Sequence, residues 1–134
     1  MTQTEVNNIA FNVVGCAIEV HSHLGPGLLE SVYHECLLEE LHRSGLQAVS
    51  KLPVSLKYKN RLLNSPLILD ILVNDLVIVE LKAVEIVHPV HKAQLLSYLR
   101  LANKPKGLLI NFHVSRLIDG VTHLVTEEFA KLDK

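Results

Sequence analysis

Three ionisable residues interrupt the two most apolar stretches of the sequence: Asp70 in "PLILDILV", and Glu80 and Lys82 in "LVIVELKAVEIV". Removing a charged side chain from water costs several kcal/mol unless the charge is paired or coordinated. Glu80 and Lys82 are two positions apart, so on a strand their side chains point to the same face of the sheet. Two carboxylates beside one ammonium leave a negative charge, and Mg²⁺ or Mn²⁺ prefers such oxygen ligands. This pattern favours a metal site over the alternative, a structural buried ion cluster.

The connection between these two apolar stretches decides whether Asp70 and Glu80 can share one site. A turn of only two residues, 74–75, would place the two carboxylates on opposite faces of the sheet. A three-residue connection that pairs Val73 with Val77, or a bulge, brings them to the same face. We therefore predict such an irregularity, and a regular two-residue hairpin would contradict a shared site.

A further polar group lies on the helix that we expect from about Val90 to Asn103. His91, Gln94 and Tyr98 recur at i, i+3 and i+7 and therefore share one face of this helix, while leucines occupy another face. Because a buried strand follows, we expect the helix to pack on the sheet and to present the glutamine and the tyrosine to the carboxylates. The alternative is the ordinary solvated edge of a helix.

Two helices are expected before the first strand. Thr2 and Glu5 have the spacing of a capping box, and apolar residues then recur at helical intervals until Gly25-Pro26-Gly27 ends the helix. A second helix is expected from about Leu28 to Arg43.

The remaining segments predict a mixed sheet. Residues 48–60 alternate loosely and indicate a strand with a solvated face, residues 107–114 indicate a buried strand, and the tail indicates an edge strand and a short helix. With the two apolar strands, which are expected to be antiparallel, this order predicts the α/β (α+β) class. We expect a mixed central β-sheet flanked by helices, in a single domain that covers residues 1–134.

The chain carries Asp70, then "ELK" at residues 80–82 and "QLLSY" at residues 94–98, and "GLLESVY" precedes them at residues 27–33. This ordered set resembles the PD-(D/E)XK nuclease superfamily and, more narrowly, the GxxExxY protein family within it. The resemblance extends over essentially the whole chain. One departure is that Leu69 stands where the superfamily's name has a proline.

The resemblance implies a restriction-endonuclease-like core with a divalent-metal site. Asp70 and Glu80 would bind Mg²⁺ or Mn²⁺, with the backbone carbonyl of Leu81 as a further ligand. Lys82 would orient the attacking water or stabilise charge on the phosphate. Glu30 matches an acidic residue of the first helices that completes the metal shell in similar nucleases.

Four more side chains are candidates for supporting roles. Gln94 and Tyr98 match the family's helix motif and would position the substrate or support the site, and His91 would contact a substrate phosphate. Tyr33, one turn after Glu30, would pack against or hydrogen-bond to that carboxylate. We expect a carboxylate oxygen of Glu30 to lie ~4–5 Å from an oxygen of Asp70 or Glu80, with a metal ion between them.

Two functions of different classes remain. The first is a Mg²⁺-dependent nuclease that acts on DNA or RNA, and the alternative is a non-catalytic nuclease-fold module that acts through a partner protein or nucleic acid. A formal charge of −1 means that nucleic acid would need a local basic patch, for which Lys51, Lys57, Lys59 and Arg61 are the candidates. Because a recognition domain is not apparent, specificity would come from a homodimer or from a partner protein.

Other sites and locations are disfavoured. His21-x-His23 and His88-x-x-His91 do not have a zinc spacing, and no cysteine pair supports them. Cys16 and Cys36 lie in helical patterns and indicate buried free thiols of a reducing compartment, and no histidine is placed to make Cys36 a nucleophile. The sequence begins without signal-peptide features and has no membrane-spanning run, so we expect a cytoplasmic protein without a membrane partner.

Overall fold

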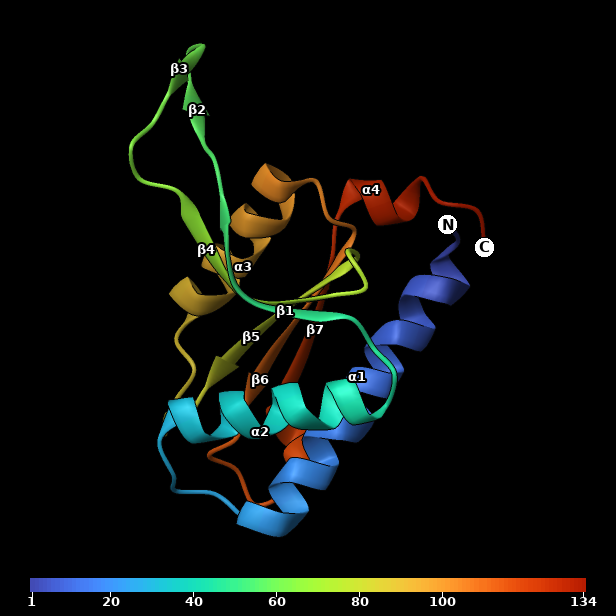
Figure 1. Cartoon of the computed structure of the whole chain (residues 1–134), viewed down its shortest axis with the longest axis vertical. Helices are drawn as coiled ribbons and strands as arrows, with labels where there is room; N and C mark the ends of the chain where they lie inside the picture. Colours follow the sequence, from blue (N-terminus) through green and yellow to red (C-terminus); the bar gives the residue numbers. More distant parts are fainter.

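The computed structural model describes all 134 residues and has a five-stranded β-sheet at its centre (Figure 1). The helices are α1 (Gln3–Leu24), α2 (Glu30–Arg43), α3 (Pro89–Ala102), α4 (Glu127–Ala130) and the 3₁₀ helix η1 (Leu117–Gly120). The strands are β1 (Ala48–Val54), β2 (Lys57–Tyr58), β3 (Arg61–Leu62), β4 (Leu67–Val73), β5 (Val77–Lys82), β6 (Lys106–Asn111) and β7 (Val121–Val125).

The central sheet is mixed, with the strand order β1-β4-β5-β6-β7. All neighbours are antiparallel except β5 and β6, which are parallel and are joined by α3. Such a parallel pair needs a long crossover connection, and a helix usually provides it. The predicted α/β (α+β) class, a mixed central sheet flanked by helices, is therefore confirmed, as are the strand and the short helix predicted in the tail.

Hydrophobic residues of α1 and α2 cover one face of the sheet, and those of α3 cover the other. The first face carries a cluster of 19 buried residues. The second face carries a cluster of six: Leu69, Leu72, Ile78, Leu95, Leu99 and Leu109. Strands β4 and β5 contribute to both clusters, because alternate side chains of a central strand point to opposite faces.

Helix α1 has the boundaries that its end residues predict. The Thr2 hydroxyl accepts the backbone N–H of Glu5 at 3.1 Å, which satisfies one of the free donors at the helix start. Gly25 ends the helix with φ = 68°, in the left-handed region that glycine adopts easily.

The connection between β4 and β5 has the predicted odd length. Val73 pairs with Val77, so the connection consists of Asn74, Asp75 and Leu76. Asn74 and Asp75 both have positive φ, 50° and 59°, which short polar residues tolerate better than β-branched ones. This register brings the two carboxylates of the apolar strands to the same level of the sheet.

Strand β4 changes the face that it presents to the core at Asp70. Ile71 packs on the face covered by α1 and α2, and regular alternation would place Leu69 on the same face. Leu69 instead packs in the cluster of α3. The regular pleat of β4 is therefore interrupted at the carboxylate.

Strand β1 changes face at the same level. Ala48 packs on the face of α1 and α2. Leu52 is an even number of residues away and would share that face in a regular strand, but it packs on the face of α3. Between them, Lys51 has φ = 52°, which is uncommon for a residue other than glycine in a strand. The register on either side places Lys51 opposite Asp70, so the two interruptions lie side by side.

A hairpin projects from the body of the molecule between β1 and β4 (Figure 1). We call residues 55–66 the arm; it contains β2 and β3, which pair with each other in a separate two-stranded sheet. The expected strand over residues 48–60 is therefore wrong in its second half: β1 ends at Val54, and a turn at Lys59 and Asn60 reverses the chain. Tyr58 lies on the arm and is 60% exposed.

Three further expectations concern the thiols and the membrane. Cys16 and Cys36 are both free, as expected, but Cys36 on α2 is only half-buried. None of the helices combines the length and the apolar character that crossing a bilayer requires.

Candidate active site

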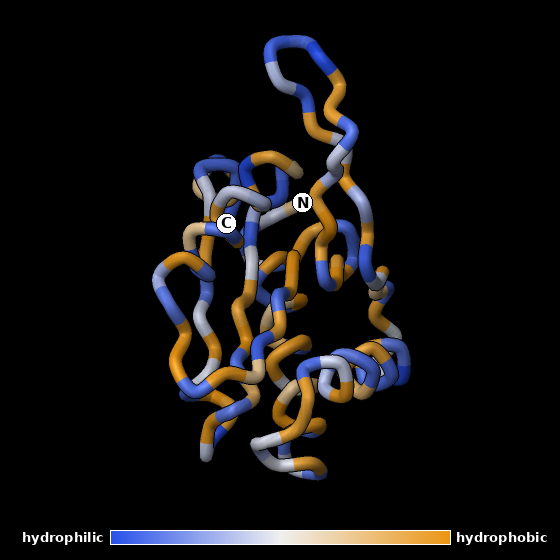
Figure 2. The backbone as a smooth tube through the Cα atoms, turned by 90° about the vertical axis from the view of Figure 1, so that its left-hand side faces the viewer, coloured by the Kyte–Doolittle hydropathy of each residue, from blue (hydrophilic) through white to orange (hydrophobic).

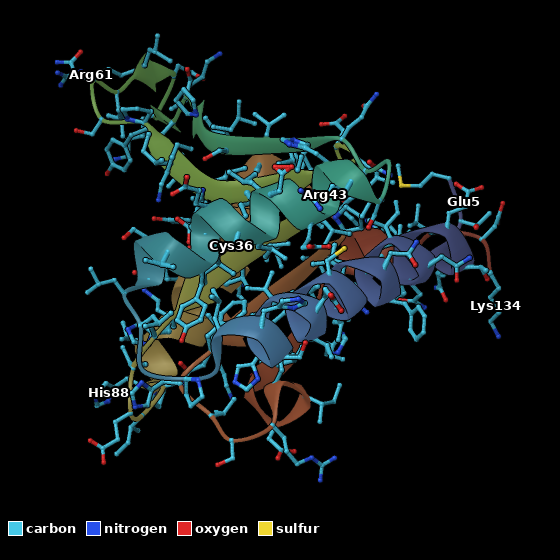
Figure 3. All side chains as sticks on the ribbon, turned by 60° about the horizontal axis from the view of Figure 1, so that its bottom comes forward. Glu5, Cys36, Arg43, Arg61, His88 and Lys134 are labelled. Atoms are coloured by element: carbon cyan, nitrogen blue, oxygen red, sulfur yellow. The ribbon has the colours of Figure 1, made fainter.

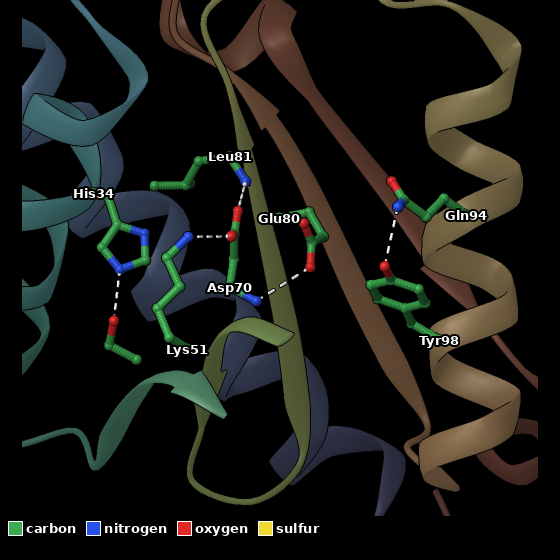
Figure 4. A network of polar contacts seen from close by, with 8 residues as sticks. His34, Lys51, Asp70, Glu80, Leu81, Gln94 and Tyr98 are labelled. Carbon is green, nitrogen blue, oxygen red and sulfur yellow. Dashed lines mark hydrogen bonds and ion pairs between the residues drawn. The ribbon is translucent and has the colours of Figure 1, made fainter. Parts of the chain in front are cut away.

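Asp70 and Glu80 are joined through hydrogen bonds to each other's strands, between α2 on one side and α3 on the other (Figure 4). The backbone N–H of Asp70 donates to Glu80 Oε1 at 3.2 Å, and the backbone N–H of Leu81 donates to Asp70 Oδ2 at 3.1 Å. The regular pairing of β4 with β5 reaches only Ile71–Val79. Beyond that pair the carboxylates accept from the backbone donors, so both side chains are held in place by the sheet itself.

The second oxygen of Asp70 faces Lys51, which was expected only as part of a basic patch. Lys51 Nζ lies 2.9 Å from Asp70 Oδ1 and donates a hydrogen bond to it. The Lys51 side chain is 61% exposed and that of Asp70 is 16% exposed, so the ion pair lies at the edge of the site. Lys51 thus supplies a positive charge beside Asp70 that the sequence pattern did not predict.

The two carboxyl groups have pKa values shifted in opposite directions. Burial, and then the negative charge of Asp70, raise the pKa of Glu80 to about 8. Burial acts in the same direction on Asp70, but hydrogen bonds from Lys51 and from the Leu81 N–H outweigh it and hold the pKa of Asp70 below its usual value. Glu80 is therefore the carboxyl group of the pair that takes up a proton more readily.

The raised pKa of Glu80 makes the stability of the fold depend on pH. The pKa of Glu80 is higher in the folded chain than in the unfolded chain, so the unfolded chain binds fewer protons from about pH 4.5 to pH 8 and stability falls as pH rises. Glu80→Gln keeps the acceptor oxygen and removes the titration. We expect the mutant to gain on the order of 2 kcal/mol in unfolding free energy relative to wild type between pH 5.5 and pH 8. Urea unfolding in EDTA measures this, and parallel pH profiles would contradict it.

Lys82 follows Glu80 on the same side of β5 and is half-buried. Its positive charge lowers the pKa of Glu80, but burial and Asp70 act more strongly in the opposite direction. The Lys82 ammonium makes no hydrogen bond and no ion pair with another side chain. It is therefore free to bind an anion at the carboxylates.

Gln94 and Tyr98 project from α3 toward the strands that carry the carboxylates (Figure 4). Gln94 Nε2 donates to the Tyr98 hydroxyl at 3.0 Å, and neither side chain is hydrogen-bonded to Asp70 or Glu80. His91, on the first turn of α3, has a buried Nδ1 without a hydrogen-bond partner. The predicted polar face of the helix therefore exists, and its contacts with a substrate stay a prediction.

Glu30 is not brought into one ligand group with the other carboxylates. It is exposed at the first position of α2, and the structure contains no group of three or more His, Cys, Asp or Glu side chains able to hold a metal ion. Glu30 and Asp70 do line one cavity of about 190 Å³, together with Ser31, His34 and Lys51. The Lys51 ammonium is the group that contacts Asp70, and a role of Glu30 beside that carboxylate stays a prediction.

Tyr33 supports the entry into α2 rather than the Glu30 carboxylate. Its ring is fully buried and stacks on Phe112 with 4.5 Å between the ring centroids. Its hydroxyl donates to the Gly25 carbonyl and accepts the Leu28 N–H at 3.1 Å. Tyr33 therefore fixes the loop between α1 and α2 and cannot contact a substrate.

His34 is a cavity residue that sequence reasoning missed. Its Nε2 lies 2.8 Å from the Ser50 hydroxyl, and burial, followed by the charge of Lys51, lowers its pKa. His34 is four residues after Glu30 and therefore on the same face of α2, which was the signal available in the sequence. For Leu81, the contact with Asp70 uses the backbone N–H, and the expected role of its carbonyl stays a prediction.

Comparison with known proteins gives one match. The sequence-family model of the PD-(D/E)XK nuclease superfamily matches residues 7–123. This range begins in α1 and ends in β7. No curated protein and no solved structure matches the chain. The matched range includes Asp70, the "ELK" strand and the "QLLSY" helix. The chain belongs to the PD-(D/E)XK nuclease superfamily.

Proposed function

We propose that this protein is a metal-dependent nuclease that hydrolyses phosphodiester bonds of DNA or RNA. One observation carries the proposal: Asp70 and Glu80, on neighbouring strands, are hydrogen-bonded into one unit at the end of the regular β4–β5 pairing, and Lys82 follows on the same side. Membership of the superfamily supports this reading. The narrower resemblance to the GxxExxY family rests on the "GLLESVY" motif at residues 27–33.

The residues present fit Mg²⁺ or Mn²⁺. Mg²⁺ is commonly held by one or two carboxylates while water and substrate phosphates complete its octahedral shell, so Asp70 and Glu80 are sufficient without Glu30. The raised pKa of Glu80 reflects burial and repulsion by Asp70, and a divalent cation would relieve that repulsion. A bound cation would supply positive charge at the scissile phosphate and make a water molecule more acidic.

The side chains around the carboxylates have complementary roles in this proposal. The unpaired Lys82 ammonium would stabilise the negative charge that develops on the phosphate or orient the attacking water. Gln94 and Tyr98, which are already hydrogen-bonded to each other, would position the substrate from the side of α3. Lys51 would move from Asp70 to a substrate phosphate, since its exposed side chain can follow either anion.

The Lys51–Asp70 ion pair also favours a second function, a non-catalytic module that acts through a partner protein or nucleic acid. In that case the Lys51 ammonium, rather than a metal ion, would satisfy the Asp70 carboxylate permanently, and the cluster would serve the fold alone. The two functions differ in their need for a cation.

Binding of Mn²⁺ separates them. We expect calorimetric titration to give one Mn²⁺ site on the wild-type protein and at least about 10-fold weaker binding to Asp70→Asn. Asp75→Asn is the matched control, because Asp75 lies on the β4–β5 connection and is paired with Lys104 at 2.8 Å, away from the site. Absence of binding at millimolar Mn²⁺, or equal binding by both mutants, would favour the non-catalytic module.

A further inference from the structure

The arm has the charge of a surface that binds polyanions. It contains Lys57, Lys59 and Arg61, all exposed, and no carboxylate. Since the chain as a whole has a formal charge of −1, the residues outside the arm carry −4. Figure 2 shows the tip of the arm as a hydrophilic segment held away from the rest of the chain.

The arm is built to hold this charge in a defined place. Lys59 and Asn60 have φ of 48° and 68°, as in the tight turns that match the twist of a two-stranded ribbon. Leu63 N–H donates to the Leu56 carbonyl at 2.8 Å and closes the ribbon at its base. Glycine would adopt the positive φ of Lys59 with less strain. A lysine therefore occupies the tip at a conformational cost that glycine would avoid.

The arm is also continuous with the candidate site. Its two ends run directly into β1 and β4, which carry Lys51 and Asp70 opposite each other. About nine residues separate Asp70 from the tip, and at ~3.3 Å per residue the arm extends at most roughly 30 Å from the carboxylates. A duplex rises ~3.4 Å per base pair, so this reach corresponds to roughly nine base pairs. Figure 3 shows Arg61 at the far end of the arm.

We propose that the arm binds the phosphate backbone of double-stranded nucleic acid beside the bond that is cut, an inference that rests on the proposed nuclease function. Single strands are bound by a basic groove combined with several aromatic side chains on which successive bases stack. The arm offers only Tyr58 for stacking, and Lys59 Nζ lies 5.4 Å from the centre of that ring. Three cations on a paired two-stranded ribbon suit the regularly spaced phosphates of a duplex backbone instead.

The test compares two triple mutants with the same change in charge. The arm mutant combines Lys57→Ala, Lys59→Ala and Arg61→Ala; the control combines Arg116→Ala, Lys131→Ala and Lys134→Ala, which are exposed cations outside the arm. Both carry Asp70→Asn so that no probe is cut, and circular dichroism checks their folding. Fluorescence anisotropy measures binding to 30-base-pair DNA and RNA duplexes and to single strands, as a function of salt.

We expect the arm mutant to bind the duplexes at least about 10-fold more weakly than Asp70→Asn alone, and its slope of log K against log salt to decrease by roughly 2–3. The control should lose less than about 3-fold. Equal losses by both triple mutants, an unchanged salt slope, or the same loss on single strands would overturn the inference and leave the nuclease function standing. If Asp70→Asn alone bound no nucleic acid, the nuclease function itself would fail.

Discussion

The Asp70→Asn protein should cleave labelled duplex DNA on the order of 10³-fold more slowly than wild type in the presence of Mg²⁺. Asparagine has nearly the same shape and keeps an oxygen for the Leu81 N–H, so the sheet is preserved. It removes the negative charge that would hold the cation and that now pairs with Lys51. Single-turnover cleavage measures this effect separately from product release.

Asp75→Asn is the control for this experiment as well, and it should cleave like wild type because the Asp75 side chain is 84% exposed and away from the carboxylates. Cleavage that persists unchanged in Asp70→Asn would identify a contaminating nuclease and contradict the assignment of the site. Adding EDTA to the wild-type protein should reproduce the loss, because the proposed reaction needs a divalent cation.

Lys82→Met should reduce the cleavage rate by about 10²-fold and change the Kd for the duplex by less than about 3-fold. Methionine retains most of the apolar stem, and no hydrogen bond or ion pair of the folded protein is lost, because the ammonium has none. The loss would therefore fall on kcat rather than on KM. A structural role predicts instead a lower unfolding free energy with an unchanged rate.

The measurement combines single-turnover cleavage, anisotropy on an uncut probe and urea unfolding on the same preparations. Lys131→Met serves as the matched control, since Lys131 is exposed and lies outside the sheet and the site. Equal cleavage by both mutants would remove Lys82 from the proposed mechanism.

Where the information is local, the sequence predicts the structure well. The side chains of a strand alternate with a period of two, so a site shared by Asp70 and Glu80 requires a connection of odd length or a bulge. The pairing of Val73 with Val77 confirms the odd connection. The start of α1 is similarly determined by residues within one turn, Thr2 and Glu5.

The parts that the sequence did not predict depend on long-range geometry. The Lys51–Asp70 pair joins residues 19 positions apart and requires the register of β1 on β4, for which the apolar pattern has no signal. Residues 48–60 alternate through the end of β1, so the point at which the arm leaves the sheet is hidden in the pattern. Glu30 was assigned to the site by its motif, but the placement of α2 over the sheet decides its distance from Asp70.

The backbone hydrogen bonds of Asp70 and Glu80 have a consequence for how this sequence can diverge. A substitution that removes either carboxylate without replacing its oxygen leaves a backbone N–H without its acceptor, at a cost of about 1–3 kcal/mol if that donor is shielded from water. A lineage that no longer needs the chemistry would still be selected to keep these two side chains, or their amides, for folding. Retention of both acids in descendants would then be poor evidence of activity, whereas the fate of the unpaired Lys82, which no such bond protects, would be the informative marker.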